Sequence, residues 1–100
     1  FILNLEPLSF LQRLAESLEY VSLLDRAVLT DSPVERFHLI TSFIVSQLST
    51  HLERMSKPFN PLLGETFEVK LDSPSSCHYV AEQVSHHPPI SAFFIRGNQW

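Results

Sequence analysis

The chain has 100 residues, of which 44% are hydrophobic and 18% charged, a balance typical of a folded globular domain rather than of a disordered segment. Its 7 basic and 11 acidic residues leave a formal net charge of −4, which argues against broad nucleic-acid binding and against electrostatic adsorption to anionic membranes. A single cysteine, Cys77, excludes an internal disulfide and any zinc module built from several cysteines.

The first predicted element is an amphipathic helix over residues 8–20. Ser9 and Gln12 fit a capping box, in which the hydroxyl and the amide cover backbone N–H groups reciprocally. Leucines then recur at helical spacing. We expect residues 22–31, which follow it, to form a loop or a short helical turn.

A second helix is predicted over residues 33–55. Ser32 precedes Pro33, which occupies the first helical position, and Glu35 stands at the third position. The apolar stripe that follows is wide, so we expect this helix to be buried on most of one side. Pro58 and Pro61 then end the helical pattern.

After Gly64 the hydrophobic period changes from 3.6 to 2, which indicates strands. Three are predicted, over residues 66–71, 78–85 and 90–96, and the short turns between them favour an antiparallel meander. Helices followed by a growing antiparallel sheet predict an α+β fold. Three strands cannot close a barrel and both ends of the sequence are apolar, so we expect residues 1–100 to be part of a larger domain.

The segment Lys57-Pro58-Phe59-Asn60-Pro61 is the first candidate for a binding function. Its two prolines predict a stiff loop from which Lys57 and Asn60 project. One cation and one amide on a rigid loop suit an anionic, oxygen-rich ligand, because little entropy is lost on binding. The alternative is that Lys57 only caps the helix C-terminus and the prolines only turn the chain.

His86 and His87, followed by two prolines, are the second candidate. Pro88 and Pro89 cannot donate ladder hydrogen bonds, so the strand is interrupted here and both imidazoles could turn toward one site. Protonated histidine donates from both ring nitrogens, which suits a phosphate group. The alternative is a pair of partly exposed polar residues at a strand end.

Zinc and hydrolysis are weaker interpretations of the same region. Cys77, His78 and the histidine pair offer ligand atoms, but none of the usual zinc spacings occurs. Ser85 lies beside His86, but no nucleophile elbow surrounds it, and adjacent residues are poorly placed as nucleophile and base. We therefore expect no metal site, no other cofactor and no catalytic residues.

Two stretches of the sequence resemble one known family. Residues 82–89 read E-Q-V-S-H-H-P-P, and residues 57–67 read K-P-F-N-P-L-L-G-E-T-F. The first is similar to the signature of the oxysterol-binding protein family, and the second is similar to the family's K-P-x-N-P-x-L-G-E segment. Residues 6–14 and 33–36 resemble its first bundle helices. The resemblance extends over the whole chain but covers only the first part of the family's ligand-binding domain.

The resemblance implies a lipid-transfer domain, in which a helical layer and an incomplete antiparallel β-barrel enclose a tunnel. The tunnel would carry a sterol or oxysterol, or alternatively phosphatidylinositol 4-phosphate or another phospholipid. The family's head-group contacts fall on Lys57, Asn60, His86 and His87. Such a carrier is cytoplasmic, touches membranes transiently at contact sites, binds no nucleic acid and is not an enzyme. Two alternatives stay open from the residues alone: a protein-interaction module with an exposed sheet edge, and a metal-dependent hydrolase that uses the histidine pair.

Overall fold

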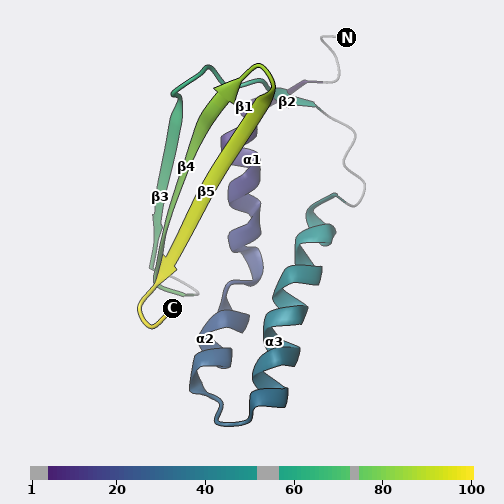
Figure 1. Ribbon diagram of the computed structural model, residues 1–100, viewed down its shortest axis with the longest axis vertical. Helices are drawn as coiled ribbons and strands as arrows, with labels where there is room; N and C mark the ends of the chain where they lie inside the picture. Colours follow the sequence, from purple (N-terminus) through teal and green to yellow (C-terminus); the bar gives the residue numbers. More distant parts are fainter. Residues whose placement is uncertain (1–4, 52–56, 73–74) are drawn as a thin grey trace.

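A computed structural model describes residues 5–51, 57–72 and 75–100. The elements, in chain order, are β1 (Leu5–Ser9), α1 (Phe10–Leu14), the 3₁₀ helix η2 (Ala15–Tyr20), α2 (Ser22–Leu29), α3 (Pro33–Ser46), the 3₁₀ helix η3 (Gln47–His51), β2 (Lys57–Phe59), β3 (Thr66–Leu71), β4 (Cys77–His86) and β5 (Pro89–Gly97). Strands β3, β4 and β5 form one sheet, and the helical segments lie on one side of it (Figure 1). The α+β class predicted from the sequence is confirmed.

The first helix begins at Phe10, two residues later than predicted, and its capping box is present. The Ser9 hydroxyl accepts from the Gln12 N–H at 3.4 Å, and the Gln12 amide oxygen accepts from the Ser9 N–H at 2.9 Å. The α-helix changes to 3₁₀ geometry after Leu14, so the predicted single helix consists of α1 and η2.

Residues 22–31, expected to be a loop or a short helical turn, contain the eight-residue helix α2 instead. Its carbonyl end is covered from α3, because the Arg36 guanidinium donates to Ala27 O at 3.1 Å and to Thr30 O at 2.7 Å. Satisfying the last carbonyls of a helix stabilises its C-terminus. This contact from another helix is not visible in the local sequence, which explains the wrong prediction.

The second predicted helix starts at Pro33, and the Ser32 hydroxyl accepts from the Glu35 N–H at 3.3 Å as expected for its cap. It becomes 3₁₀ after Ser46 and is described to His51; the predicted residues 52–55 lie outside the described residues. Contrary to the expected burial, only Leu39 of α3 is buried. Its exposed large apolar side chains are Val34, Phe37, Ile40, Ile44 and Val45. None of the helices in the described ranges is long and apolar enough to cross a membrane.

The sheet is the antiparallel meander that the alternation predicts. β3 spans the predicted residues, and β4 and β5 each extend one residue beyond the predicted range at both ends. A second pair was not predicted: β1 runs parallel to β2, with Leu5 opposite Lys57 and Ser9 opposite Phe59. Lys57 to Phe59 are therefore a short strand rather than the expected loop.

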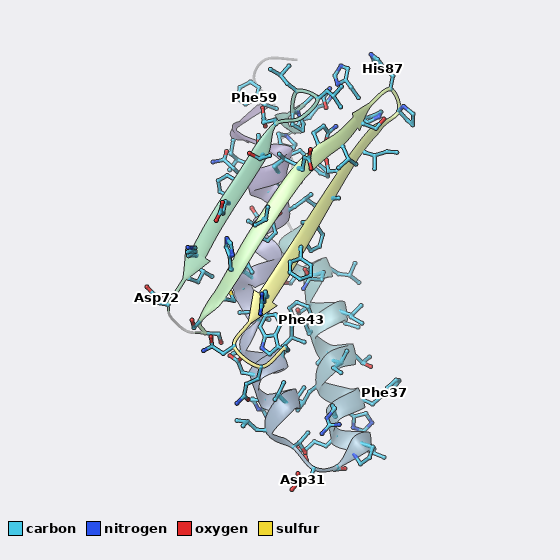
Figure 2. All side chains as sticks on the ribbon, turned by 60° about the vertical axis from the view of Figure 1, so that its left-hand side comes forward. Asp31, Phe37, Phe43, Phe59, Asp72 and His87 are labelled. Atoms are coloured by element: carbon cyan, nitrogen blue, oxygen red, sulfur yellow. The ribbon has the colours of Figure 1, made fainter. Side chains whose placement is uncertain are left out.

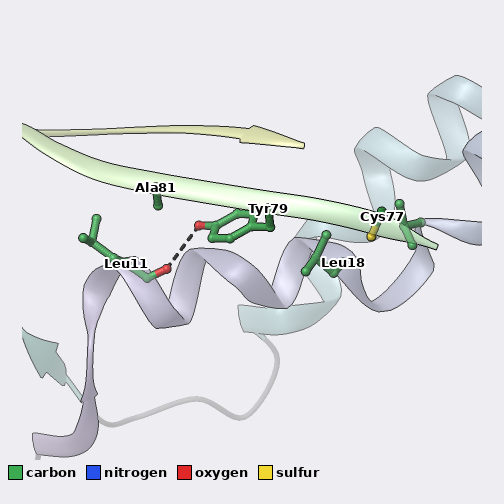
Figure 3. Packing of buried hydrophobic residues seen from close by; sticks show 6 residues of the cluster. Leu11, Leu18, Cys77, Tyr79 and Ala81 are labelled. Carbon is green, nitrogen blue, oxygen red and sulfur yellow. Dashed lines mark hydrogen bonds between the residues drawn. The ribbon is translucent and has the colours of Figure 1, made fainter. Parts of the chain in front are cut away.

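The core lies between the inner face of the sheet and α1–η2. Leu11, Leu18 and Val21 pack against Cys77, Tyr79 and Ala81 of β4 (Figure 3). The Tyr79 hydroxyl donates to Leu11 O at 3.1 Å, so the polar tip of this fully buried ring is satisfied. This contact holds β4 against α1. The other end of β4, which carries His86, lies outside this core cluster.

Candidate functional site

A pocket of about 430 Å³ brings Lys57 and Asn60 together at one end of the molecule. β2 and the residues next to it supply one wall, Phe10 and Arg13 of α1 supply another, and Pro89 of β5 completes the lining. Both predicted residues are exposed, as a head-group contact requires. The pairing of β2 with β1 anchors this wall beside α1.

The charges of this pocket favour an anion. Its lining contains two cationic side chains, Lys57 and Arg13, and no carboxylate among the described residues. The chain as a whole carries a net charge of −4, so this pocket differs in sign from the average surface. Arg13 adds the second positive charge to this lining.

Arg13 was missed by the sequence interpretation. It stands in a leucine-rich helix far from Lys57 in sequence, and only the packing of α1 beside β2 brings the two cations into one lining. The one local signal was a basic residue in the last turn of a short helix, which is more commonly read as a partner for the helix dipole.

The two histidines lie together at the hairpin between β4 and β5. His86 ends β4 and His87 begins the turn, and their ring centroids are 4.4 Å apart with an interplanar angle of 63°. His87 is exposed, whereas His86 is half-buried and its Nδ1 has no hydrogen-bond partner among the described residues. Because this nitrogen is itself buried, the exposed ring of His87 is the more accessible part of the pair.

The Lys57–Asn60 pair and the His86–His87 pair lie at the same end of the molecule. They do not line the same pocket. Figure 2 shows Phe59 and His87 at the same end of the molecule. Pro89 lines the pocket and stands opposite His86 in the β4–β5 register, whereas neither imidazole is among the pocket's lining residues. Pro89 thus connects the Lys57–Asn60 pair to the histidine pair.

The geometry disfavours the zinc and hydrolase interpretations. Cys77 and His86 occupy opposite ends of the ten-residue strand β4, and at ~3.3 Å per residue they lie about 30 Å apart. His78 is paired with Glu68 at 2.5 Å. Burial, and after it the Asp25 carboxylate, raises the pKa of the Cys77 thiol, which keeps the thiol protonated and unreactive. Within the described ranges, no group of three or more histidine, cysteine or acidic side chains could hold a metal.

Comparisons with known proteins agree with the family resemblance found in the sequence. The profile of the family described as Oxysterol-binding protein matches residues 2–100. Oxysterol-binding protein-related protein 2 of Homo sapiens is 50% identical over 92 residues, which cover 92% of this chain and 19% of that protein. Oxysterol-binding protein-related protein 1 of Homo sapiens is 51% identical over 92 residues, covering 92% of this chain and 10% of that protein.

Two solved structures share the fold. The Osh1 ORD domain, solved in complex with ergosterol, matches with a TM-score of 0.87 and 46% identity over 94% of this chain and 22% of that one. The Osh3 ORD of Saccharomyces cerevisiae, solved with PI(4)P, matches with a TM-score of 0.84 and 36% identity over 95% of this chain and 25% of that one. The chain therefore spans a quarter or less of each of these proteins.

Proposed function

Because this chain belongs to the oxysterol-binding protein family, we propose that it forms the first part of a domain that binds single lipids and transfers them between membranes. The lipids are a sterol or oxysterol and, alternatively, phosphatidylinositol 4-phosphate or another phospholipid. The complexes of Osh1 with ergosterol and of Osh3 with PI(4)P support both ligand classes. In this proposal residues 1–100 supply the helical layer and the first barrel strands around the tunnel.

The observation that carries the head-group assignment is the cationic pocket containing Lys57 and Asn60, next to the histidine hairpin. A phosphate monoester needs several donors and positive charge, and these residues offer an ammonium, an amide and two imidazoles. A sterol carries one hydroxyl and no charge. Lys57, Asn60, His86 and His87 should therefore distinguish a phosphoinositide from a sterol.

Under this proposal the protein is a lipid carrier and not an enzyme. It would act in the cytoplasm and touch membranes transiently at contact sites, with no nucleic-acid partner. The net charge of −4 supports brief rather than stable adsorption to anionic membranes, although the pocket end carries two cations.

Lipid extraction by the full-length protein tests this function. Vesicles would contain phosphatidylinositol 4-phosphate or a fluorescent sterol, and the wild type would be compared with a His86→Ala/His87→Ala double variant. Each lost charged hydrogen bond is worth about 1.5–3 kcal/mol, so phosphoinositide extraction should fall at least tenfold. Sterol extraction should remain close to that of the wild type.

His78→Ala is the matched control, because His78 lies on the same strand but pairs with Glu68 on the outer face of the sheet. It should leave extraction of both lipids unchanged. Equal loss of both lipids in the double variant would show that the histidine pair is structural. Failure of the wild type to extract a sterol, phosphatidylinositol 4-phosphate or any other phospholipid supplied in the vesicles would refute the carrier function itself.

A further inference from the structure

Gln83 is a buried polar residue within the β4 segment that leads to the histidine pair. Its side chain is 1% exposed and follows Tyr79 and Ala81 on the inner face of the strand. The Gln83 Oε1 accepts a hydrogen bond from the hydroxyl of Ser91, its direct partner on β5. A buried amide is costly unless it is hydrogen-bonded, so this cross-strand pair favours one particular pairing of the two strands.

The register of the hairpin changes immediately after this pair. Gln83 stands opposite Ser91, but the next pair is Ser85 with Ile90, so β4 carries one residue more than β5 over this step. Such a β-bulge interrupts the alternation of side chains between the two faces. Because a shift of one residue moves every following side chain to the other face, the bulge decides the direction of His86.

The backbone of Gln83 also contacts the other half of the site. Its N–H donates to Glu65 O at 3.0 Å, and its carbonyl accepts from the Gly64 N–H at 2.9 Å. Gly64 and Glu65 end the segment that begins with the pocket residues Lys57 and Asn60. Gln83 is thus bonded both to the segment that carries one pair of site residues and to the hairpin that carries the other.

We propose that Gln83 is a positioning residue for phosphoinositide recognition. Its side-chain bond with Ser91 holds the register at the bulge, and the bulge holds His86 and His87 in a fixed direction relative to the pocket. The inference rests on the proposed head-group site. It assigns to Gln83 and Ser91 a selective effect on the charged ligand, although neither residue has to contact that ligand.

The test compares Gln83→Met, Ser91→Ala and the double variant with the wild type in the full-length protein. Methionine has a similar length and suits a buried position, so the core should remain filled. A buried hydrogen bond favours its own arrangement by a factor of about 2 to 12, so extraction of phosphatidylinositol 4-phosphate should fall by up to about tenfold, while sterol extraction should stay within about twofold of the wild type. The double variant should be no weaker than the weaker single variant, because both changes remove the same bond.

Glu68→Gln is the matched control, because it alters another polar cross-strand pair of the same sheet, on its outer face and away from the hairpin. It should change the extraction of neither lipid. Hydrogen–deuterium exchange of residues 84–90 supplies a second measurement and should increase in Gln83→Met but not in Glu68→Gln. Equal loss of both lipids, additive losses in the double variant, or unchanged exchange in the hairpin would overturn the inference. A wild type that takes up sterol but no phosphoinositide would instead refute the head-group site.

Discussion

The two ends of β4 differ sharply, although both carry residues with potential chemistry. At the start of the strand, Cys77 and Tyr79 are buried against the helices. At its other end, His86 is half-buried and His87 is exposed on the hairpin. The two ends are part of one strand, but they differ in their surroundings and in the bulge that precedes His86.

The surroundings assign opposite roles to these ends. Burial raises the pKa of Tyr79 to about 12, and burial with the nearby Asp25 carboxylate raises the pKa of Cys77, so both side chains stay neutral and contribute to packing. His87, by contrast, is exposed at the hairpin, and the pocket beside the hairpin is cationic. Residue type alone would not have separated the stabilising end from the binding end.

The largest expected effect is a loss of folding stability at the buried end of β4. Tyr79→Ala would remove the side chain that packs between Phe67 and Phe93 and that bonds Leu11 O. Truncation of a buried aromatic residue typically costs about 3–5 kcal/mol of unfolding free energy. Urea unfolding of the full-length protein would measure the loss. Both lipids should be affected alike; a selective loss of phosphoinositide extraction would break the division between the two ends.

Alkaline pH should also weaken the buried end. The Tyr79 phenol ionises near pH 12 in the folded state against 10 when exposed, so the unfolded chain releases its proton first. The stabilisation from the Tyr79 phenol is complete below pH 10 and is lost, by roughly 3 kcal/mol, as the pH rises through about 12. Unfolding measured between pH 9 and about 12 would show this decline. Tyr79→Phe should be less stable at neutral pH but show a smaller decline, and identical pH profiles would contradict the assignment.

A smaller and selective effect is expected at the binding end. Lys57→Gln would keep a polar side chain, one atom shorter, but remove its charge from the pocket. Because Lys57 is exposed, we expect a loss of about 1.5 kcal/mol in phosphoinositide binding, the lower end for a charged hydrogen bond. Vesicle extraction at two salt concentrations would measure it. Lys70→Gln, on β3 outside this pocket, is the control, and an equal effect of both variants would indicate only a general charge effect.

The smallest effect is expected from Cys77→Ala. The buried sulfur fills space at the apolar end, so its loss should cost about 1 kcal/mol of unfolding free energy. Extraction of both lipids should be unchanged, because the strand places Cys77 far from the hairpin. Metal analysis of the purified wild type provides the complementary measurement. Stoichiometric zinc, or a loss of lipid extraction in the variant, would restore the metal-dependent interpretation.

Local sequence was sufficient for the features that neighbouring residues control. Ser9 with Gln12, and Ser32 with Glu35, mark helix starts because a cap is formed within one turn of the helix. The alternation around Val69 predicted β3 because a half-buried strand repeats every two residues. The two motifs also identified Lys57, Asn60, His86 and His87 as one candidate group through the family resemblance.

Contacts between distant segments decided the rest. The parallel pairing of β1 with β2, the covering of the α2 carbonyls by Arg36, and the position of Arg13 beside Lys57 each join residues that the local pattern does not connect.

The α+β class, the helix caps, the strands β3, β4 and β5 and the residue types available for a phosphate follow from the sequence alone. Tertiary contacts were needed to show which of these residues lie together, that Tyr79 and Cys77 are sealed in the core, and that a bulge next to Gln83 sets the direction of the histidines. The physical reason is that capping and alternation are short-range, whereas burial, pocket charge and strand register are set by partners distant in the chain.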